Sequence, residues 1–461
     1  MSRRRPCFVT GATIVIAAVT LFTMTGCSKP TVASVEIVSD GSGGAVVAWS
    51  QGDSHVQRLD EHGEKLWKDV VVCSSRGPTG TKDMADLGGN GVVLAWADTR
   101  NSTPGHLDDL DIYAQRVGPQ GEVLWDPEGL PIAVALGYQE SPVVVSDDDN
   151  QVIVVWRESL LDGGRAIRAK KVGLQGENTW DNEGVVVCTY PAVPIPPFAT
   201  VSDGQGGVIV VWEDERENFS SIYAQRVDSA GNPLWAENGV PLAPGRYNSP
   251  EIIADGQHGA IIAWRAGHTD TARVYAQRVD GDGTLLWAGE GLFVCVPTLG
   301  IWSMATDGEG GALFAWEDMD PQAQTHTLHA KRVNGEGEVL WEKELAVSHA
   351  LEESFHVALT GSGTSGAIIV WRLGASPHTG GVVYAQKLDA KGDILWAKDG
   401  VQVFSQTLKY QGIPQVISDG YGGAIITAVT GKSDSKKDLL HAQRLDAEGN
   451  AVWENGVRIT P

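Results

Sequence analysis

The sequence predicts an all-β fold, a single eight-bladed β-propeller of four-stranded blades, for three reasons. A motif of roughly 55 residues recurs eight times, which is a typical length for one blade. Each copy contains four short β-type runs separated by glycine-rich turns. No apolar pattern with the period of a helix follows the first thirty residues. Seven blades is the alternative, if the short first copy does not form a full blade.

The copy at residues 202–242 shows the four strands most clearly. The first strand is the apolar run before an Asp-Gly-x-Gly-Gly turn, and the second is the continuous apolar run that ends at Trp212. Continuous apolar runs are typical of strands that are covered on both faces. The third strand alternates over Tyr223-Ala-Gln-Arg-Val, and an Asp-x-x-Gly turn leads to a fourth that includes Trp235. Glycine suits both turns because it adopts a positive φ at little cost.

Two tryptophan positions per repeat explain why the chain has 16 Trp and only 8 Phe. A large indole at a fixed place can fill the space between neighbouring blades. Tryptophan occupies the second position in all eight repeats, whereas the last repeat has Ala428 at the first position. The first position is Trp49, Trp96, Trp156, Trp212, Trp264, Trp316 and Trp371, and the second is Trp67, Trp125, Trp180, Trp235, Trp287, Trp341, Trp396 and Trp453. Only Trp302 lies outside these positions.

Charged residues that recur in the copies are predicted to be structural, because a functional site would need one of them and not eight. We expect the cations to pair with a turn aspartate or to stack on a tryptophan. The cations are Arg58, Arg116, Lys171, Arg226, Arg278, Arg332, Lys387 and Arg444, and the recurring aspartates are Asp40, Asp147, Asp203, Asp255, Asp307 and Asp419.

Composition excludes several classes of protein. The formal net charge is −23, which argues against a nucleic-acid partner, because phosphate contacts need clustered Lys and Arg. The chain is 42% hydrophobic and 20% charged, which argues against disorder. Five Cys cannot form a disulfide scaffold, and we expect Cys73, Cys188 and Cys295 to be buried free thiols in strand four of alternate blades.

The repeat also resembles known propeller repeats. Asp-Gly-x-Gly-Gly-Ala-x-x-x-Trp followed by Tyr-Ala-Gln-Arg-Val-Asp-x-x-Gly-x-x-x-Trp looks like a repeat of secreted and cell-surface bacterial propeller proteins. Its second half, for example Tyr384 to Trp396, is similar to the tryptophan-docking repeat of pyrroloquinoline-quinone-type eight-bladed propellers, with an Asp-to-Gly spacing one residue shorter. The resemblance covers roughly residues 33–461 and implies an eight-bladed propeller without indicating an activity.

The N-terminus predicts an export signal and a lipid anchor. Three arginines precede an uncharged apolar stretch, and Met24-Thr-Gly-Cys27 resembles the lipobox of bacterial lipoproteins, in which that Cys is acylated. An uncleaved membrane anchor is the alternative. We therefore expect a signal peptide at residues 1–26, a lipid-anchored tether at 27–32 and a propeller at 33–461. The protein would then be anchored to the cell membrane on its extracytoplasmic side.

Residues that break the repeat are the candidates for ligand binding. The loops between strands two and three and the loops that join blades open on one face, and rigid frames commonly present ligand sites on such variable loops. The relevant segments are 97–112, 189–198, 244–249, 297–303 and 405–413. The aromatic residues of the blade-joining loops, predicted to bind a ligand by stacking, are Tyr138, Tyr190, Tyr247, Trp302 and Tyr410. The alternative is that these rings only seal the blades.

No motif identifies a catalytic centre or a metal site. Asp98, Asp108, Asp109 and Asp111 could bind calcium, but the complete calcium-loop pattern is absent, so no cofactor is predicted. His326 and His329 lack a third zinc ligand in the sequence. The sequence favours a surface-anchored binding or scaffold module for protein or glycan, and an enzyme is the less favoured reading. The alternative function is an extracytoplasmic carbohydrate-active enzyme that uses paired acids at the channel mouth.

Lipidation can be tested directly in cells that process lipoproteins. We predict that Cys27→Ala, or treatment with globomycin, leaves the uncleaved precursor in the membrane fraction. Mass spectrometry of the mature N-terminus should find a diacylated Cys27 in the untreated protein. Normal cleavage of the Cys27→Ala variant would contradict the lipoprotein interpretation.

Overall fold

A computed structural model gives the fold of the chain. It describes residues 32–460 except for short segments within the loops. These segments are residues 74–81, 103–108, 148–149, 161–162, 191–196, 217–219, 244, 246, 268–271, 298–300, 321, 323–324, 349–353, 364–365, 375–380, 406–407, 409 and 432–437. The predicted signal peptide and the candidate ligand Asp108 therefore lie outside the described residues.

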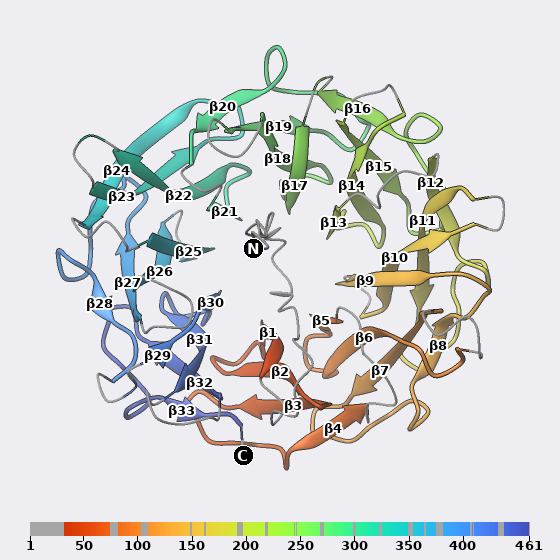
Figure 1. The fold of residues 1–461 in the computed structure, drawn as a ribbon, viewed down its shortest axis with the longest axis horizontal. Coiled ribbons are helices and arrows are strands. Elements are labelled where there is room, and N and C mark those ends of the chain that lie inside the picture. Colours follow the sequence, from red (N-terminus) through yellow and green to blue (C-terminus); the bar gives the residue numbers. More distant parts are fainter. Residues whose placement is uncertain are drawn as a thin grey trace, which may run out of the picture.

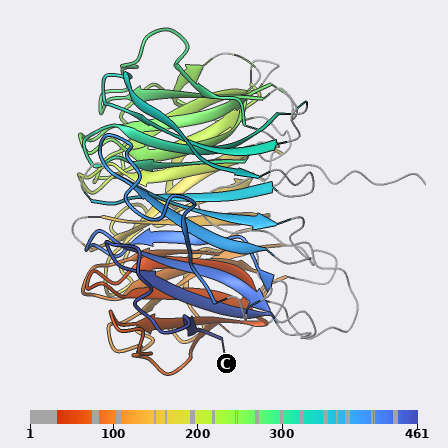
Figure 2. The ribbon, with the colours of Figure 1, turned by 90° about the vertical axis from the view of Figure 1, so that its left-hand side faces the viewer.

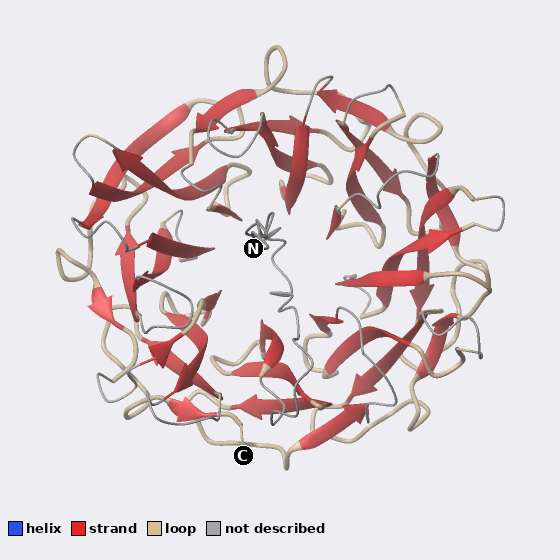
Figure 3. Cartoon of the chain, in the orientation of Figure 1, coloured by secondary structure: helices blue, strands red, loops and turns tan. Residues whose placement is uncertain are grey.

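Eight antiparallel sheets surround a common axis, one for each copy of the sequence motif (Figures 1 and 3). The prediction of an eight-bladed propeller is confirmed, and the short first copy forms a complete blade. The first four blades are β1(Ala33–Ser39), β2(Ala45–Gln51), β3(Asp53–Leu59) and β4(Val70–Cys73); β5(Lys82–Asp86), β6(Val92–Asp98), β7(Asp111–Val117) and β8(Leu130–Ala133); β9(Gln139–Ser146), β10(Val152–Ser159), β11(Arg165–Val172) and β12(Val185–Tyr190); and β13(Phe198–Ser202), β14(Val208–Asp214), β15(Ser221–Val227) and β16(Val240–Ala243).

The last four blades repeat this order, with the first strand of each blade nearest the axis (Figure 1). They are β17(Tyr247–Ala254), β18(Ala260–Ala266), β19(Arg273–Val279) and β20(Leu292–Cys295); β21(Trp302–Thr306), β22(Ala312–Asp320), β23(Thr325–Val333) and β24(Val339–Ser348); β25(Ser354–Gly361), β26(Ala367–Gly374), β27(Val382–Leu388) and β28(Val401–Gln402); and β29(Tyr410–Gln411), β30(Gln415–Ser418), β31(Ala424–Gly431), β32(Leu439–Leu445) and β33(Val457–Arg458). In blade 8 the inner strand is divided into β29 and β30, and both parts pair with β31.

The ring closes without exchange of strands, because every sheet is built from strands that are consecutive in the sequence. Blade 8 packs directly on blade 1, and one apolar cluster contains Trp49 and Leu59 of blade 1 with Ile425 and Trp453 of blade 8. The Lys65 ammonium also donates a 2.8 Å hydrogen bond to the carbonyl oxygen of Ile459. The junction between the two ends of the chain therefore has the same character as the junctions inside it.

One hydrogen bond recurs at every junction between blades. The indole N–H of the second tryptophan of a blade donates to a backbone carbonyl in the turn between strands three and four of the next blade. The eight bonds, with N···O distances of 2.8–3.1 Å, are Trp67–Pro119, Trp125–Leu174, Trp180–Ser229, Trp235–Gly281, Trp287–Gly335, Trp341–Ala390, Trp396–Ala447 and Trp453–Glu61. The last of these bonds joins blade 8 to blade 1.

The glycine of each Asp-x-x-Gly turn is required by this contact. Gly231 has φ +88°, and a Cβ added there would lie 3.1 Å from the ring of Trp180 in the preceding blade. At the closing junction Gly63 has φ +83°, and an added Cβ would lie 2.8 Å from Trp453. A side chain at either position would be strained and would push the indole away from its acceptor.

The recurring cations reinforce the same junctions, as predicted. The guanidinium of Arg226 pairs with the turn carboxylate of Asp203 in its own blade at 2.8 Å. It also donates to Gly281 O, the carbonyl that accepts the indole N–H of Trp235. Equivalent pairs with the turn aspartate are Arg58–Asp40, Lys171–Asp147, Arg278–Asp255, Arg332–Asp307 and Arg444–Asp419. In the other two blades Leu87 and Ser362 stand in place of the aspartate, and Arg116 and Lys387 donate to backbone carbonyls.

The first tryptophan of each repeat fills the space between blades. Trp212 and Trp264 are fully buried, and Trp235 and Trp287 are 8% and 5% exposed, so the predicted burial of these rings is confirmed. Trp264 lies in a cluster that joins blades 4 and 5 and includes Ile262, Val211 and Ala224. Each sheet therefore buries apolar side chains on both of its faces.

Truncation of a buried indole should test how much the junctions contribute to stability. Trp264→Ala removes a ring with no exposed surface and should lower the free energy of unfolding by roughly 3–5 kcal/mol. Leu286→Ala is the matched control, because Leu286 is 44% exposed and should cost less than about 1 kcal/mol. Urea unfolding followed by tryptophan fluorescence measures both values. Equal losses in the two variants would show that the junction does not depend on the indole.

Candidate ligand-binding face

The two faces of the ring differ in how much they vary from blade to blade. Because the strands of each blade alternate in direction, the turns between strands one and two and between strands three and four share one face, here called the turn face. The loops between strands two and three and the connections between blades share the opposite face, here called the loop face. Figure 2 views the ring from its edge, with the two faces pointing left and right.

The five aromatic residues predicted to bind ligand occupy different environments. Tyr138 is 41% exposed, whereas Tyr190 and Trp302 are 5% and 4% exposed and belong to apolar clusters between blades. Tyr247 is half-buried and packs on Trp264 with ring centroids 6.0 Å apart. Tyr410 is the first residue of β29, and its side chain lies outside what the structure describes. The structure brings Tyr138 and Tyr190 to one end of blade 3 and leaves the others in blades 5, 6 and 8.

Blades 2 and 4 carry a polar cluster at the loop end of strand two. In blade 4 the Asp214 carboxylate accepts the indole N–H of Trp212 at 3.0 Å and pairs with Arg216. The Arg216 guanidinium lies 4.3 Å from the centroid of the Tyr223 ring. Blade 2 repeats the arrangement with Trp96, Asp98, Arg100 and Tyr113, where the cation lies 3.8 Å from the ring. The charges of these two clusters are therefore satisfied within each blade.

Blades 1, 3 and 5 share a different feature that sequence reasoning missed. Their inner strands contain a bulge at Ser34, Ser141 and Ser249, with φ values of +46°, +53° and +53°. The same three blades carry the buried cysteines Cys73, Cys188 and Cys295, whose burial was predicted from their positions. In blades 3 and 5 a proline follows the bulged serine, and this Ser-Pro pair lies at the same distance before the turn aspartate in both blades. The pair was the one sign of the bulge in the sequence. Blades 1, 3 and 5 therefore differ from blades 2 and 4 in the inner strand and in strand four.

The inner strands contain carboxyl groups at equivalent positions. Glu36, Asp83 and Glu251 each pair across the sheet with the alanine that directly precedes the first tryptophan of the blade. Asp83 accepts a 2.7 Å hydrogen bond from the amide of Val144 in the next blade, and burial raises the pKa of its carboxyl to about 7. Burial also raises the pKa of Glu251 well above its usual range. The repeat pattern did not draw attention to these residues because this position is not conserved among the eight blades; Val143 and Ala199, for example, occupy it in blades 3 and 4.

The residues considered as metal ligands have other contacts. His326 Nδ1 lies 2.5 Å from the carboxylate of Glu317, and His329 stacks on Trp316. Asp111 accepts a 2.7 Å hydrogen bond from the Asn101 amide. Within the described parts of the chain, no three His, Cys, Asp or Glu side chains are grouped so as to hold a metal ion.

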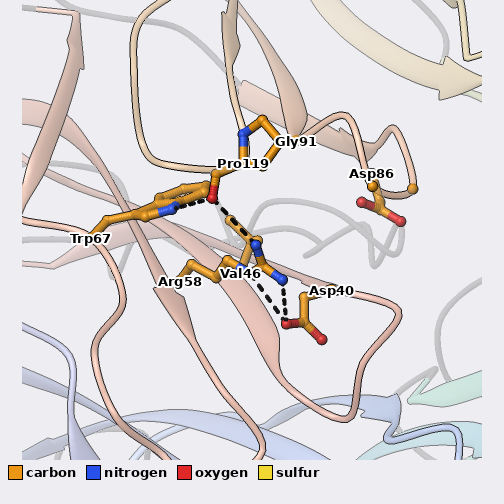
Figure 4. A pocket seen from close by; sticks show the side chains of 9 residues that line it. Asp40, Val46, Arg58, Trp67, Asp86, Gly91 and Pro119 are labelled. Carbon is orange, nitrogen blue, oxygen red and sulfur yellow. Dashed lines mark hydrogen bonds and ion pairs between the residues drawn. The ribbon is translucent and has the colours of Figure 1, made fainter.

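A small hollow between blades 1 and 2 on the turn face marks a departure from the repeat (Figure 4). Leu87 stands where six other blades have the turn aspartate, and the preceding residue, Asp86, lines the hollow. Arg58 and Trp67 line the other side and both donate to Pro119 O (Figure 4). Burial raises the pKa of the Asp86 carboxyl. The hollow belongs to the junction and contains none of the predicted ligand-binding residues.

Comparisons with known proteins give similarity of structure only. No model of a known protein family matches the sequence, and no curated protein matches it. The structure is similar to a eukaryotic initiation factor, with 10% identity over 94% of this chain and 89% of that chain and a TM-score of 0.45. It is also similar to the polysaccharide lyase Uly1, with 10% identity over 74% and 84% of the two chains and a TM-score of 0.42. A third similarity is to the K499G mutant of NanB sialidase from Streptococcus pneumoniae, with 8% identity over 80% and 68% of the two chains and a TM-score of 0.36.

The buried inner-strand acids predict that stability falls as the pH rises. A carboxyl whose pKa is raised in the folded state stays protonated there at pH values at which the same group is already ionised in the unfolded chain. The free energy of unfolding therefore falls as the pH rises from the pKa of the unfolded state to the pKa of the folded state. For Asp83 this window runs from about 4 to about 7. Asp83→Asn and Glu251→Gln should each reduce the loss of stability between pH 5 and pH 8, by on the order of 1 kcal/mol or more. Urea unfolding at the two pH values measures this, and Glu215→Gln, at an exposed loop position, should leave the pH dependence unchanged.

Proposed function

We propose that this protein is a lipid-anchored extracytoplasmic binding module whose loop face holds a glycan or protein ligand. The observation that carries the proposal is the difference between the two faces. The turn face repeats one set of contacts, in which an indole and usually an arginine share a carbonyl of the next blade. Identical turns present no unique shape to a ligand.

The loop face differs from blade to blade, as a surface that recognises a particular ligand must. Blades 2 and 4 end in clusters of Asp, Arg and Tyr, whereas blade 3 ends in arginines, serines and tyrosines and blade 6 in a His–Glu pair. Variable polar and aromatic groups on a rigid frame are typical of a binding site. The loop face is therefore where we place the ligand.

The lipid anchor would hold this same face toward the membrane. The inner strand β1 begins at Ala33 on the loop face and runs toward the turn face. Five residues separate Cys27 from Ala33, and so short a tether spans at most about 20 Å. The ligand would then lie between the ring and the membrane, which suits an extended chain such as a glycan strand. Among the described residues, no helix is long and apolar enough to cross a bilayer.

The alternative, a carbohydrate-active enzyme, requires two carboxyl groups about 5–10 Å apart on either side of a sugar bond. The inner-strand carboxyls Asp83 and Glu251 come from blades 2 and 5 and are both buried, and Asp83 accepts a hydrogen bond from Val144 of the next blade. These positions support binding more than hydrolysis. An assay for reducing ends with any glycan that binds would distinguish the two functions, and release of reducing ends would favour the enzyme.

The proposed face can be tested by comparing one exposed tyrosine on each side of the ring. Residues 30–461 should bind at least one ligand on a combined glycan and peptide array. Tyr138→Ala on the loop face should weaken that binding at least fivefold, because an exposed ring supplies stacking area. Tyr421→Ala is the matched control, since Tyr421 is 64% exposed in a turn-face loop and should leave binding unchanged. Loss of binding only in Tyr421→Ala, or no ligand on the array, would contradict the proposal.

A further inference from the structure

The loop end of blade 3 places three polar side chains in one row across the sheet. Ser159 of β10 pairs with Arg165 of β11, and Arg165 pairs with Tyr190 of β12. Residues directly opposite in antiparallel strands project from the same face of a sheet. Tyr190 packs with Phe198 and Trp212 of blade 4, so this row faces the junction between blades 3 and 4.

Each member of the row has a buried polar atom without a hydrogen-bond partner. These atoms are Ser159 Oγ, Arg165 Nε and Tyr190 Oη, and no ion pair is described for Arg165 either. A buried polar group that lacks a partner costs roughly 1–3 kcal/mol, so three of them in one row require an explanation. All three carry a hydrogen that can be donated, and one of them belongs to a permanent cation. The species that would satisfy them is an anion with several acceptor oxygens.

The charges around the row favour an anion. Arg157 projects from the same face of β10, two residues before Ser159, and its side chain is 16% exposed. It lies 3.9 Å from the Glu140 carboxylate and also donates to Ser141 Oγ. In blade 4 the Asp214 carboxylate is held by Trp212 and Arg216. Arg157 and Arg165 of blade 3 thus face the junction, beside Glu140 of their own blade, in a chain whose net charge is −23.

Tyr138 completes the arrangement on the axis side of the row. Its carbonyl accepts the amide N–H of Ser159 at 2.9 Å, which places it opposite Ser159 at the start of β9. Tyr138 is 41% exposed, so part of its ring is free to pack against a ligand. An aromatic ring beside hydrogen-bond donors suits a sugar ring, whose C–H faces are apolar and whose edges are polar.

We propose that Ser159, Arg165 and Tyr190 bind the carboxylate of an acidic sugar, a uronate residue of a glycan, with Tyr138 packing against its ring. This inference rests on the proposed function and names the class of ligand that the loop face takes. Arg165 pairs with the carboxylate, and the hydroxyls of Ser159 and Tyr190 donate to its remaining lone pairs. Charge-assisted bonds of this kind are stronger than bonds between neutral groups.

Blade 5 offers a matched control within the same chain. The inner-strand bulges align Ser141 with Ser249, so Arg265 corresponds to Arg157. The pairs Ile167–Cys188 and Val274–Cys295 align Arg165 with Ala272. Gly267 and Pro297 stand where blade 3 has Ser159 and Tyr190. Blade 5 therefore keeps one of the two cations, Arg265, and has none of the three donors of the row. Its exposed Arg273 corresponds to Ala166, which projects from the other face of the sheet.

Calorimetric titration of residues 30–461 with four-residue oligomers of galacturonate and of glucuronate tests the proposal. At least one oligomer should bind, and its methyl ester, which lacks the charge, should bind at least tenfold more weakly. Arg165→Gln should weaken binding at least tenfold and Tyr190→Phe severalfold, whereas Arg273→Gln should stay within twofold of the unchanged protein. Thermal unfolding of each variant shows whether the fold is retained. Because Tyr190→Phe and Ser159→Ala remove orphaned polar atoms, their Tm should be equal to or above that of the unchanged protein.

Four outcomes would overturn the proposal. They are no binding of either oligomer, equal binding of the methyl ester, unchanged affinity in Arg165→Gln, and tighter binding of an oligoglutamate peptide than of the uronates. Unchanged affinity in Arg165→Gln with a Tm fall in Ser159→Ala would point to a buried water that bonds the row in place of a ligand. A ligand on the array that depends on Tyr138, together with no uronate binding, would reject this inference and leave the proposed function standing. No ligand of any kind would reject both.

Discussion

A single backbone carbonyl in each blade determines how this ring is assembled. It lies in the turn between strands three and four and accepts the indole N–H of the preceding blade, as Gly281 O does from Trp235. The Arg226 guanidinium donates to the same oxygen while it pairs with the Asp203 carboxylate. The turn between strands three and four of one blade is thereby linked to the turn between strands one and two of the blade before it. Because blade 8 makes the same indole contact with blade 1, the ring needs no strand from the other end of the chain.

The residues of this contact explain why the fold could be predicted from the sequence. Trp, the turn Gly and the Arg–Asp pair are needed in almost every blade, so they recur with a regular spacing that the sequence displays openly. Gln225 has the same kind of role, since its side-chain amide accepts the backbone N–H of Trp235 and donates to the carbonyl oxygen of Ala236. Closure without strand exchange could not be predicted, because it depends on how Val32, Trp453 and Ile459 pack together in space.

The candidate site could be predicted only in part, for a physical reason. The sequence singled out Tyr138 and Tyr190 as aromatics outside the repeat, but not the row in which Ser159 and Arg165 stand between them. That row depends on strand register, which follows from the bulge at Ser141 and from the lengths of β10 and β11. The burial of Trp302, in turn, comes from its pairing with Trp316 across two strands. Side chains that bind ligand need no period, so periodicity cannot reveal them.

Hydrogen–deuterium exchange of the intact chain tests most directly whether one repeated contact closes the ring. The central claim is that the junction between blades 8 and 1 equals the internal junctions. Peptides from β2 and β31, which flank that junction, should then exchange as slowly as peptides from β14 and β18, which flank an internal one. Exchange of β2 and β31 that is faster by more than tenfold would contradict the claim. It would show that the ring opens where the two ends of the chain meet.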